Sequence, residues 1–167
     1  MKTYSLTPTQ MGIYLSETAA EGQGDYNINL VYYLDKEVDT ERLVRALRQA
    51  VKRHPYIQSR LRQTEDGEIV LTDGSEEEVA VETATANSRE EVLQRTGKAF
   101  DLLNDRLYRL VIYTLPNGTR MLNIDFHHIV CDGMSTRNFH EEVSQAYAGK
   151  YSERNSKLFN FKIIFFL

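Results

Sequence analysis

Apolar positions along the chain recur at two spacings, one typical of helices and the other of strands. After Asp39 the apolar residues follow a helical spacing, at Leu43, Leu47, Ala50 and Val51. Asp39 is a favoured helix N-cap, and Pro55 restricts the residue before it to extended backbone. These positions predict a helix that begins after Asp39 and ends near Arg53.

Three further segments have the start signals of helices. Thr7 to Gln10 reads as a capping box with a proline at the first helical position, which predicts a helix through about Thr18. Ser88 to Glu91 is a second capping box, and it predicts a helix that runs towards Phe100. A last helix is predicted from Ser135 or Thr136 to Gly149, a residue type that commonly ends helices.

Strand patterns lie between these helices. Residues 27–34 are rich in β-branched and aromatic side chains, and 79–83 form a shorter segment of the same kind. Two hairpins are predicted, one of 57–63 and 68–72 and a longer one of 107–115 and 121–130. The acidic residues 73–78 form an exposed connection. Together these helices and strands predict a mixed α/β (α+β) fold, with a mixed sheet and flanking helices in one unit.

The last residues differ in composition from the rest, which divides the chain into 1–150 and a tail, 151–167. From 155 to 167 every residue except Ser156 is Asn, Lys, Leu, Phe or Ile. Apolar residues alternate there, at Phe159, Phe161, Ile163 and Phe165, which is typical of a final strand. All five residue types also have codons made only of A and T, as in sequence read out of frame. A native strand and a truncated or frameshifted end both remain open.

Composition and charge exclude several classes of protein. The 167 residues fit one domain or one lobe, and 41% hydrophobic residues are enough for a core. With 20 Lys and Arg against 24 Asp and Glu, the net charge of −4 argues against nucleic-acid binding. No signal peptide is found, and the longest apolar run, 163–167, is too short to span a membrane. The single Cys131 forms no internal disulfide, and we expect a cytoplasmic protein.

The residues that suggest chemistry lie together between Asp125 and Gly133. His127 and His128 end a predicted strand, so their side chains point to opposite faces. His128 would continue the apolar face of Leu122, Ile124 and Phe126, and His127 the face of Asn123 and Asp125. Such a histidine is often simply a packed residue, but here two histidines precede Asp132 and Gly133. Histidine exchanges protons near neutral pH, whereas a zinc site would lack a third soft ligand and the i, i+4 spacing of helical ligands.

At this point the sequence resembles a family. Residues 127–133, His-His-Ile-Val-Cys-Asp-Gly, match the HHxxxDG signature of condensation domains from nonribosomal peptide synthetases. Residues 6–10 with 13–15 are similar to the family's opening motif, and 53–57 to the start of its second motif, RHExLRT. Segments 26–28 and 100–102 also fall where such domains have similar segments. The resemblance covers residues 1 to about 149 and extends only to the first of the family's two chloramphenicol-acetyltransferase-like lobes.

The second motif departs from the family pattern. Pro55 replaces its acidic residue, and Gln58 stands where its second arginine is expected. In the family that arginine is thought to pair with the aspartate of HHxxxDG, so Asp132 needs another partner here. Arg60 and Arg53 are the candidates. Cys131 occupies a variable position of the motif, where a small filler is favoured over a nucleophile.

The resemblance implies amide-bond formation between two thioesters held on the phosphopantetheine arms of carrier proteins, with no cofactor or metal bound directly. His127, His128, Asp132 and Gly133 would form the catalytic site: His128 contacts the amine, His127 and Asp132 hold the loop, and the Gly133 amide approaches the oxyanion. Carrier proteins and the second lobe are the implied partners. A stand-alone acyltransferase with sites between subunits, which shares the HxxxD core, remains an alternative. A carrier-binding module without catalysis is another. Relatives that epimerise or form esters carry the same motif.

Overall fold

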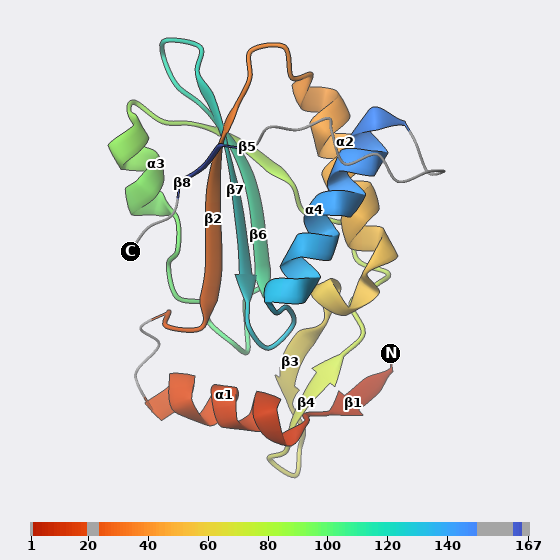
Figure 1. Ribbon diagram of the computed structural model, residues 1–167. Coiled ribbons are helices and arrows are strands. Elements are labelled where there is room, and N and C mark those ends of the chain that lie inside the picture. The colour runs from red at the N-terminus through yellow and green to blue at the C-terminus, as the bar shows by residue number, and fades with distance from the viewer. Residues whose placement is uncertain (1, 20–23, 150–161, 165–167) are drawn as a thin grey trace.

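The computed structural model describes residues 2–19, 24–149 and 162–164, and its main feature is a five-stranded sheet (Figure 1). The strand order is β5 (Glu82–Thr85), β6 (Tyr108–Thr114), β7 (Arg120–His127), β2 (Asn27–Leu34) and β8 (Lys162–Ile164). Among the strands that the structure describes in this sheet, only β5 and β6 pair in parallel. Both β2 and the long β6–β7 hairpin occur where the strand patterns predicted them, but β7 ends at His127 and not at Val130.

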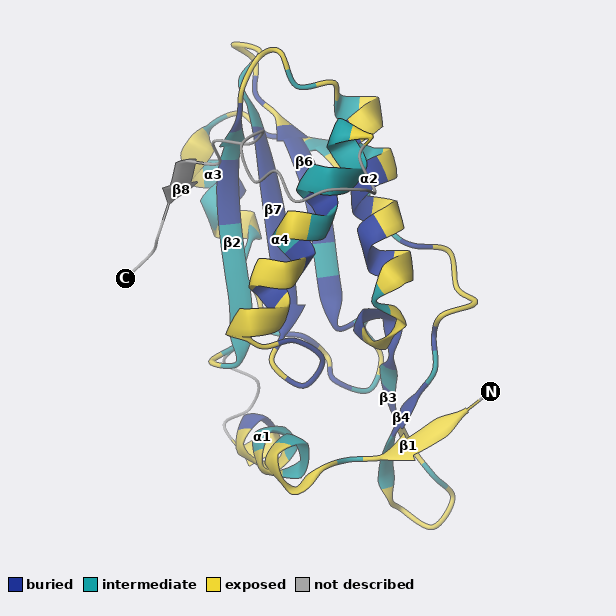
Figure 2. Cartoon of the chain, turned by 45° about the vertical axis from the view of Figure 1, so that its right-hand side comes forward, coloured by how far each residue is buried: buried dark blue, intermediate teal, exposed yellow. Residues whose placement is uncertain are grey.

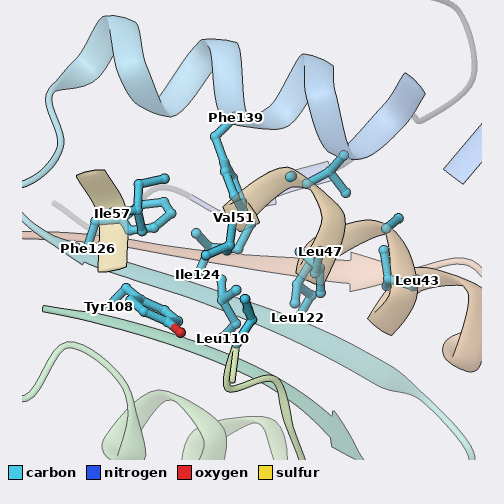
Figure 3. Close-up of a cluster of buried hydrophobic side chains, with 14 of the residues drawn as sticks. Leu43, Leu47, Val51, Ile57, Tyr108, Leu110, Leu122, Ile124, Phe126 and Phe139 are labelled. Atoms are coloured by element: carbon cyan, nitrogen blue, oxygen red, sulfur yellow. The ribbon is translucent and has the colours of Figure 1, made fainter. Parts of the chain in front are cut away.

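Two helices cover one face of this sheet. They are α2 (Thr40–Arg53) and α4 (Gly133–Ala148), and α2 begins as predicted, with the Asp39 side chain accepting a hydrogen bond from the Arg42 amide. The apolar residues predicted for α2 are buried against β6 and β7 (Figure 3). The two helices turn their exposed residues away from the sheet (Figure 2). The sheet and its two covering helices confirm the predicted mixed α/β fold. Helical spacing of the apolar residues gives each helix one apolar face, and that face packs on the sheet.

A smaller three-stranded sheet lies beyond one end of the main sheet. It consists of β1 (Thr3–Ser5), β4 (Ile69–Thr72) and β3 (Arg60–Gln63), and α1 (Pro8–Ala19) lies beside it (Figure 1). The predicted first strand of this hairpin is too long, because Pro55–Gln58 form a 3-10 helix. Proline is favoured at the start of such a turn, and Ile57 and Gln58 are buried there rather than paired.

Two other element boundaries were wrong. The strand predicted at 79–83 begins at Glu82, because the amide of Ala80 donates to the hydroxyl of Tyr108 instead of to a neighbouring strand. The helix that follows Ser88 is α3 (Arg89–Arg95), which ends well before Phe100. Gly97, with φ +66°, turns the chain back toward the sheet after that helix.

Only residues 162–164 of the tail are described. They form β8, which pairs antiparallel with β2, with Ile163 opposite Tyr32. The rest of the alternating pattern at 155–167 lies outside the described residues. Among the helices that the structure describes, none has the length and apolar character needed to cross a membrane.

Candidate active site

Strand β7 ends between the two adjacent histidines. His127 is the last residue of β7, with its amide bonded to the carbonyl of Leu107 and its side chain fully buried. His128 begins the turn 128–130, which leads to α4, and its side chain is exposed. The amide of His128 donates to the carbonyl of Tyr26 at 2.9 Å, which fixes the start of the turn.

The predicted face of the strand was correct for His127 and wrong for His128. His127 lies on the face of Asn123 and Asp125 as expected, but His128 does not continue the apolar face of β7. The strand ends because the backbone turns back on His127: the amide of Val130 donates to its carbonyl at 3.0 Å. The amide of Ile129 donates to Nδ1 of the His127 ring at 3.2 Å. The buried histidine therefore organises the turn that exposes its neighbour.

The His127 ring is enclosed by side chains from two other segments. Phe100 meets it edge to face, with ring centroids 5.8 Å apart, and a carboxyl oxygen of Glu17 lies 4.0 Å from Nε2. Burial lowers the pKa of His127 to about 4, and the nearby His128 adds to this, so the ring is neutral near pH 7. Since Nδ1 accepts a hydrogen bond, the proton of the neutral ring lies on Nε2.

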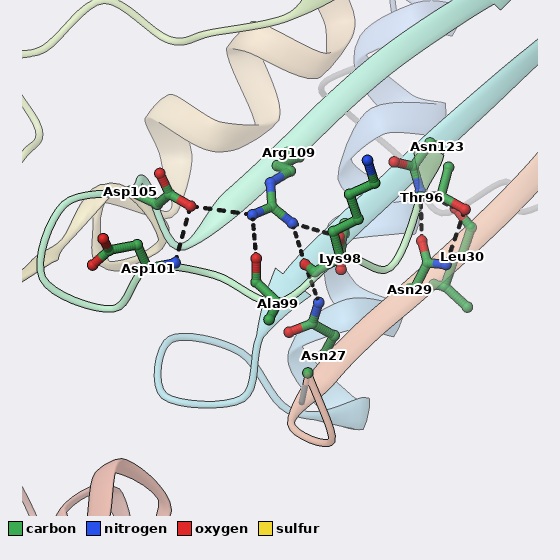
Figure 4. Close-up of polar contacts among 12 residues, drawn as sticks. Asn27, Asn29, Leu30, Thr96, Lys98, Ala99, Asp101, Asp105, Arg109 and Asn123 are labelled. Atoms are coloured by element: carbon green, nitrogen blue, oxygen red, sulfur yellow. Dashed lines mark hydrogen bonds and ion pairs between the residues drawn. The ribbon is translucent and has the colours of Figure 1, made fainter. Parts of the chain in front are cut away.

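An ion pair between half-buried Arg109 and buried Asp125 supports the segment that carries Phe100. The Arg109 guanidinium lies over the Phe100 ring, 3.7 Å from its centroid, and 3.3 Å from the carboxyl of Asp125. Arg109 also donates to the carbonyls of Lys98 and Ala99, and it meets Asp105 (Figure 4). Burial raises the pKa of Asp125 to about 6, although Arg109 opposes this.

Sequence reasoning did not single out this pair, although a signal for it existed. Arg109 and Asp125 are directly opposed in the β6–β7 register. The predicted turn at 116–119 would place Arg109 opposite Phe126, one residue out of register, whereas the structure pairs Thr114 with Arg120. Opposite charges on neighbouring strands attract, so the two charges on this hairpin were the signal, and the structure supplied their register.

Asp132 is the N-cap of α4. Its Oδ1 accepts a hydrogen bond from the amide of Ser135 at 2.7 Å. Hydrogen bonds from the side chain and the backbone of Ser135 hold the pKa of Asp132 below its ordinary value. The helix thus begins at Gly133, two residues before the predicted start. An Asp at this position satisfies helix amides that otherwise lack partners. Asp132 therefore orders the turn through the helix start.

Neither arginine proposed as the partner of Asp132 pairs with it. Arg53 lies 3.1 Å from Glu142, and Arg60 forms a bidentate ion pair with Glu77, with both hydrogen bonds at 2.8 Å. Among the described residues, Asp132 forms no ion pair. The prediction was wrong because each arginine meets a carboxylate from a different segment of the chain, which the linear sequence does not reveal.

Gly133 and Cys131 flank Asp132 and differ in surroundings. Gly133 is exposed, and a Cβ added to it would meet nothing within 4 Å, so this chain does not itself require glycine there. The chain reverses at 128–130, before Gly133, which is the first residue of α4. Cys131 is buried, it lies 3.3 Å from the Thr136 hydroxyl, and burial raises its pKa. Its surroundings are those of a packed residue.

Two exposed apolar side chains lie close to the turn, and a third lies on α1. Met134, next to Gly133, is 67% exposed, and Leu15 on α1 is 58% exposed. Tyr56 is 45% exposed, and its hydroxyl is bonded to Gln10 of α1. A shallow cavity of about 250 Å³ opens beside α1, lined in part by Tyr14, Glu17 and Phe100. No group of His, Cys, Asp and Glu within the described parts of the chain could hold a metal ion.

The fold and this turn define a class of protein, a lobe of the chloramphenicol-acetyltransferase type. The structure is similar to the condensation domain of the monacolin K polyketide synthase MokA, with a TM-score of 0.78 and 19% identity over 92% of this chain. It is likewise similar to the starter condensation domain of the rhizomide synthetase RzmA, with a TM-score of 0.75 and 17% identity over 93% of this chain. The chain covers 36% and 40% of those two structures.

The sequence comparisons narrow the class to one family. The condensation domain family model matches residues 1–163, so the chain belongs to that family. Surfactin synthase subunit 2 of Bacillus subtilis is 29% identical over 148 residues, which are 87% of this chain and 4% of that protein. Tyrocidine synthase 3 of Brevibacillus parabrevis is 30% identical over 150 residues, 88% of this chain and 2% of that protein. The expected family and fold are thereby confirmed, and the chain is a partial, N-terminal portion of such a domain.

Proposed function

We propose that this chain is the N-terminal part of a condensation domain that forms an amide bond between two carrier-bound thioesters. The observation that carries this proposal is the exposure of His128 beside the start of α4, on a turn held by a buried His127. Within the described residues, the His128 ring has no hydrogen-bond partner of its own. A histidine presented in this way is available to a substrate amine.

The chemistry needs little more than positioning and a place for a proton. The acceptor amine attacks the carbonyl carbon of the donor thioester, a C–N bond forms, the C–S bond breaks, and the thiol of the donor arm leaves. The amine nitrogen loses one proton, and the leaving thiolate gains one. An α-amine titrates near 8, so a useful fraction is already neutral at pH 7 to 8. Holding the two groups together supplies much of the acceleration.

His128 is assigned the contact with the amine, as base or as hydrogen-bond partner. His127, neutral and buried, holds the turn, and Asp132 holds the start of α4. The amide of Gly133 is one of the helix-start amides that have no carbonyl partner within α4. Open space around Gly133 would let a developing oxyanion approach it.

The same proposal includes partners that this chain does not contain. Since the chain covers about 40% of a solved condensation domain, the substrates would bind between it and a second lobe. Exposed Met134 and Tyr56 near the turn, and Leu15 on α1, are suited to contact with that lobe or with substrate. Carrier proteins would deliver both thioesters on phosphopantetheine arms, in the cytoplasm.

The test is a single-turnover condensation assay with loaded carrier proteins, in a domain that includes the second lobe. His128→Ala is expected to lower the rate at least a hundredfold, since it removes the group that contacts the amine. The matched control is His54→Ala, because His54 lies at the end of α2 and outside the turn. A His128→Ala rate within threefold of the unmodified protein would overturn the assignment.

Two further measurements separate the alternatives. A trimer of the chain on sizing, active on a free acyl thioester, would indicate a stand-alone acyltransferase with sites between subunits. Carrier binding without turnover, unchanged by His128→Ala, would indicate a binding module.

A further inference from the structure

The buried side of helix α1 is unusual because it carries an acidic residue. Of its twelve residues the only buried one is Glu17, an acidic residue that is 2% exposed. Acidic side chains are rarely buried unless they have a partner. One carboxyl oxygen, Oε1, accepts the amide of Gly24 at 3.2 Å. The other, Oε2, has no hydrogen-bond partner among the described residues.

The unpartnered oxygen faces a second unpartnered buried atom. Nε2 of His127 is buried with no hydrogen-bond partner in the described parts of the chain, and it lies 4.0 Å from Oε2 of Glu17. Nδ1 of the same ring already accepts the amide of Ile129, so Nε2 carries the proton and can donate. A movement to a usual hydrogen-bond length of ~2.9 Å would satisfy both atoms together. Left unmade, each is a costly buried polar group.

Helix α1 also reaches the turn at a second point. The side-chain amide of Gln10 donates to the carbonyl of Ile129 at 2.8 Å. Gln10 and Glu17 are seven residues apart, two helical turns, and therefore lie on the same side of α1. One helix thus approaches the turn 127–130 from two positions, at Ile129 and at the His127 ring.

We infer that Glu17 is a positioning residue, whose carboxyl group receives the Nε2–H of His127 and thereby holds the turn that presents His128. The inference rests on the proposed function for its effect on catalysis, but its structural part is independent of it. Glu17 holds His127, the His127 ring holds the Ile129 amide, and that amide belongs to the residue after His128. Phe100 supports the ring from another side.

The structural test is amide hydrogen exchange on this chain, with Ile124 in the middle of β7 as the internal reference. In Glu17→Leu, Nε2–H has no acceptor, and Ile129 exchange is expected to rise at least tenfold relative to Ile124. Glu17→Gln keeps an acceptor oxygen, and its ratio is expected to stay within threefold of the unmodified chain. The matched control is Glu65→Leu, the same change at an exposed turn residue. An unchanged ratio in Glu17→Leu would overturn the inference.

Nitrogen-15 NMR of the unmodified chain gives a test that needs no variant. A proton on Nε2 of His127 is expected, and a proton on Nδ1 would contradict the inference even if Glu17→Leu failed to fold.

Catalysis is tested in a complete two-lobed domain. Glu17→Leu is expected to lower kcat about tenfold with KM unchanged, and Glu17→Gln to restore most of it. Unchanged kcat in Glu17→Leu would show that Glu17 does not position His128 for the reaction. A complete domain that is inactive regardless of residue 17 would instead refute the proposed function, while hydrogen exchange would still report on Glu17.

Discussion

His127 and His128 are adjacent in the sequence, yet the first is fully buried at the end of β7 and the second is exposed on the following turn. The separation is enforced by the backbone, because the amides of Ile129 and Val130 both bond to His127. Any movement of the buried ring therefore displaces the exposed one. The two histidines have different roles for this reason, one in the structure of the turn and one at its surface.

Asp132 is expected to act on stability through its helix cap. Asp132→Ala removes the acceptor of the Ser135 amide and should lower the unfolding midpoint by ~3 °C, whereas Asp132→Asn keeps an acceptor and should lower it less. Thermal unfolding followed by circular dichroism measures both. Asp39→Ala at the cap of α2 is the matched control, since it has the same geometry away from the turn. Condensation activity lost in Asp132→Asn at unchanged midpoint would assign Asp132 a direct chemical role.

A substitution at Gly133 is expected to change catalysis without changing folding. Because a Cβ at this position meets open space, Gly133→Ala is expected to shift the unfolding midpoint by less than ~2 °C. If a substrate oxyanion approaches the Gly133 amide, the same variant should lower the condensation rate at least tenfold. Single-turnover kinetics and thermal unfolding of the same sample measure the two effects. An unchanged rate would show that no substrate atom closely approaches this residue.

Acidification is expected to destabilise the fold through His127, which is buried, and His140, which is half-buried. Burial lowers the pKa of both His127 and His140 to about 4, below the ordinary value of 6.5. The unfolded chain therefore binds more protons between about pH 6.5 and 4, and stability falls as the pH falls through this window. Asp125, whose pKa burial raises to about 6, acts in the opposite sense between about pH 6 and 4 but is a single group.

The variant that isolates one histidine is His140→Gln. His140 faces the hydroxyl of Tyr32, with Nε2 at 2.6 Å, and glutamine keeps a hydrogen-bonding group there without titrating. Urea unfolding at pH 7 and pH 5 is expected to show a loss of roughly 2 kcal/mol in the unmodified chain, after the opposing effect of Asp125, and about a quarter of that loss in His140→Gln. Equal losses in the two proteins would show that His140 does not titrate in this range.

The Arg109–Asp125 pair is expected to behave as a unit. Arg109→Met leaves a buried carboxyl without its cation and removes the bonds to Lys98 and Ala99, so the free energy of unfolding should fall by about 3 kcal/mol. The double variant Arg109→Met/Asp125→Leu should recover at least about 1 kcal/mol, because no buried charge is left unpaired. Chemical denaturation of the four members of this cycle measures the coupling. Additive losses would contradict it.

Local patterns in the sequence determined the elements whose signals are local. The Asp39 cap, the helical spacing from Leu43 to Val51 and the C-terminal Gly149 with φ +69° all act within a few residues, and α2 and α4 follow from them. The motif at 127–133 indicated the family for the same reason, since it is contiguous. Predictions from the sequence were wrong where a residue distant in the chain took a hydrogen bond that a strand would have used. The hydroxyl of Tyr108 accepts the Ala80 amide, so β5 begins later than predicted.

Only the tertiary structure decided which side chains surround the two histidines. Glu17 is 110 residues from His127 in the chain, and Arg53 and Arg60 met Glu142 and Glu77 rather than Asp132. Such pairings depend on how α1, α2 and the small sheet lie against the end of β7, and no local propensity encodes those placements. The sequence by itself therefore determined the fold class, the family and the residues of the turn. The burial that makes one histidine a support and leaves the other exposed arises from packing between segments far apart in the chain.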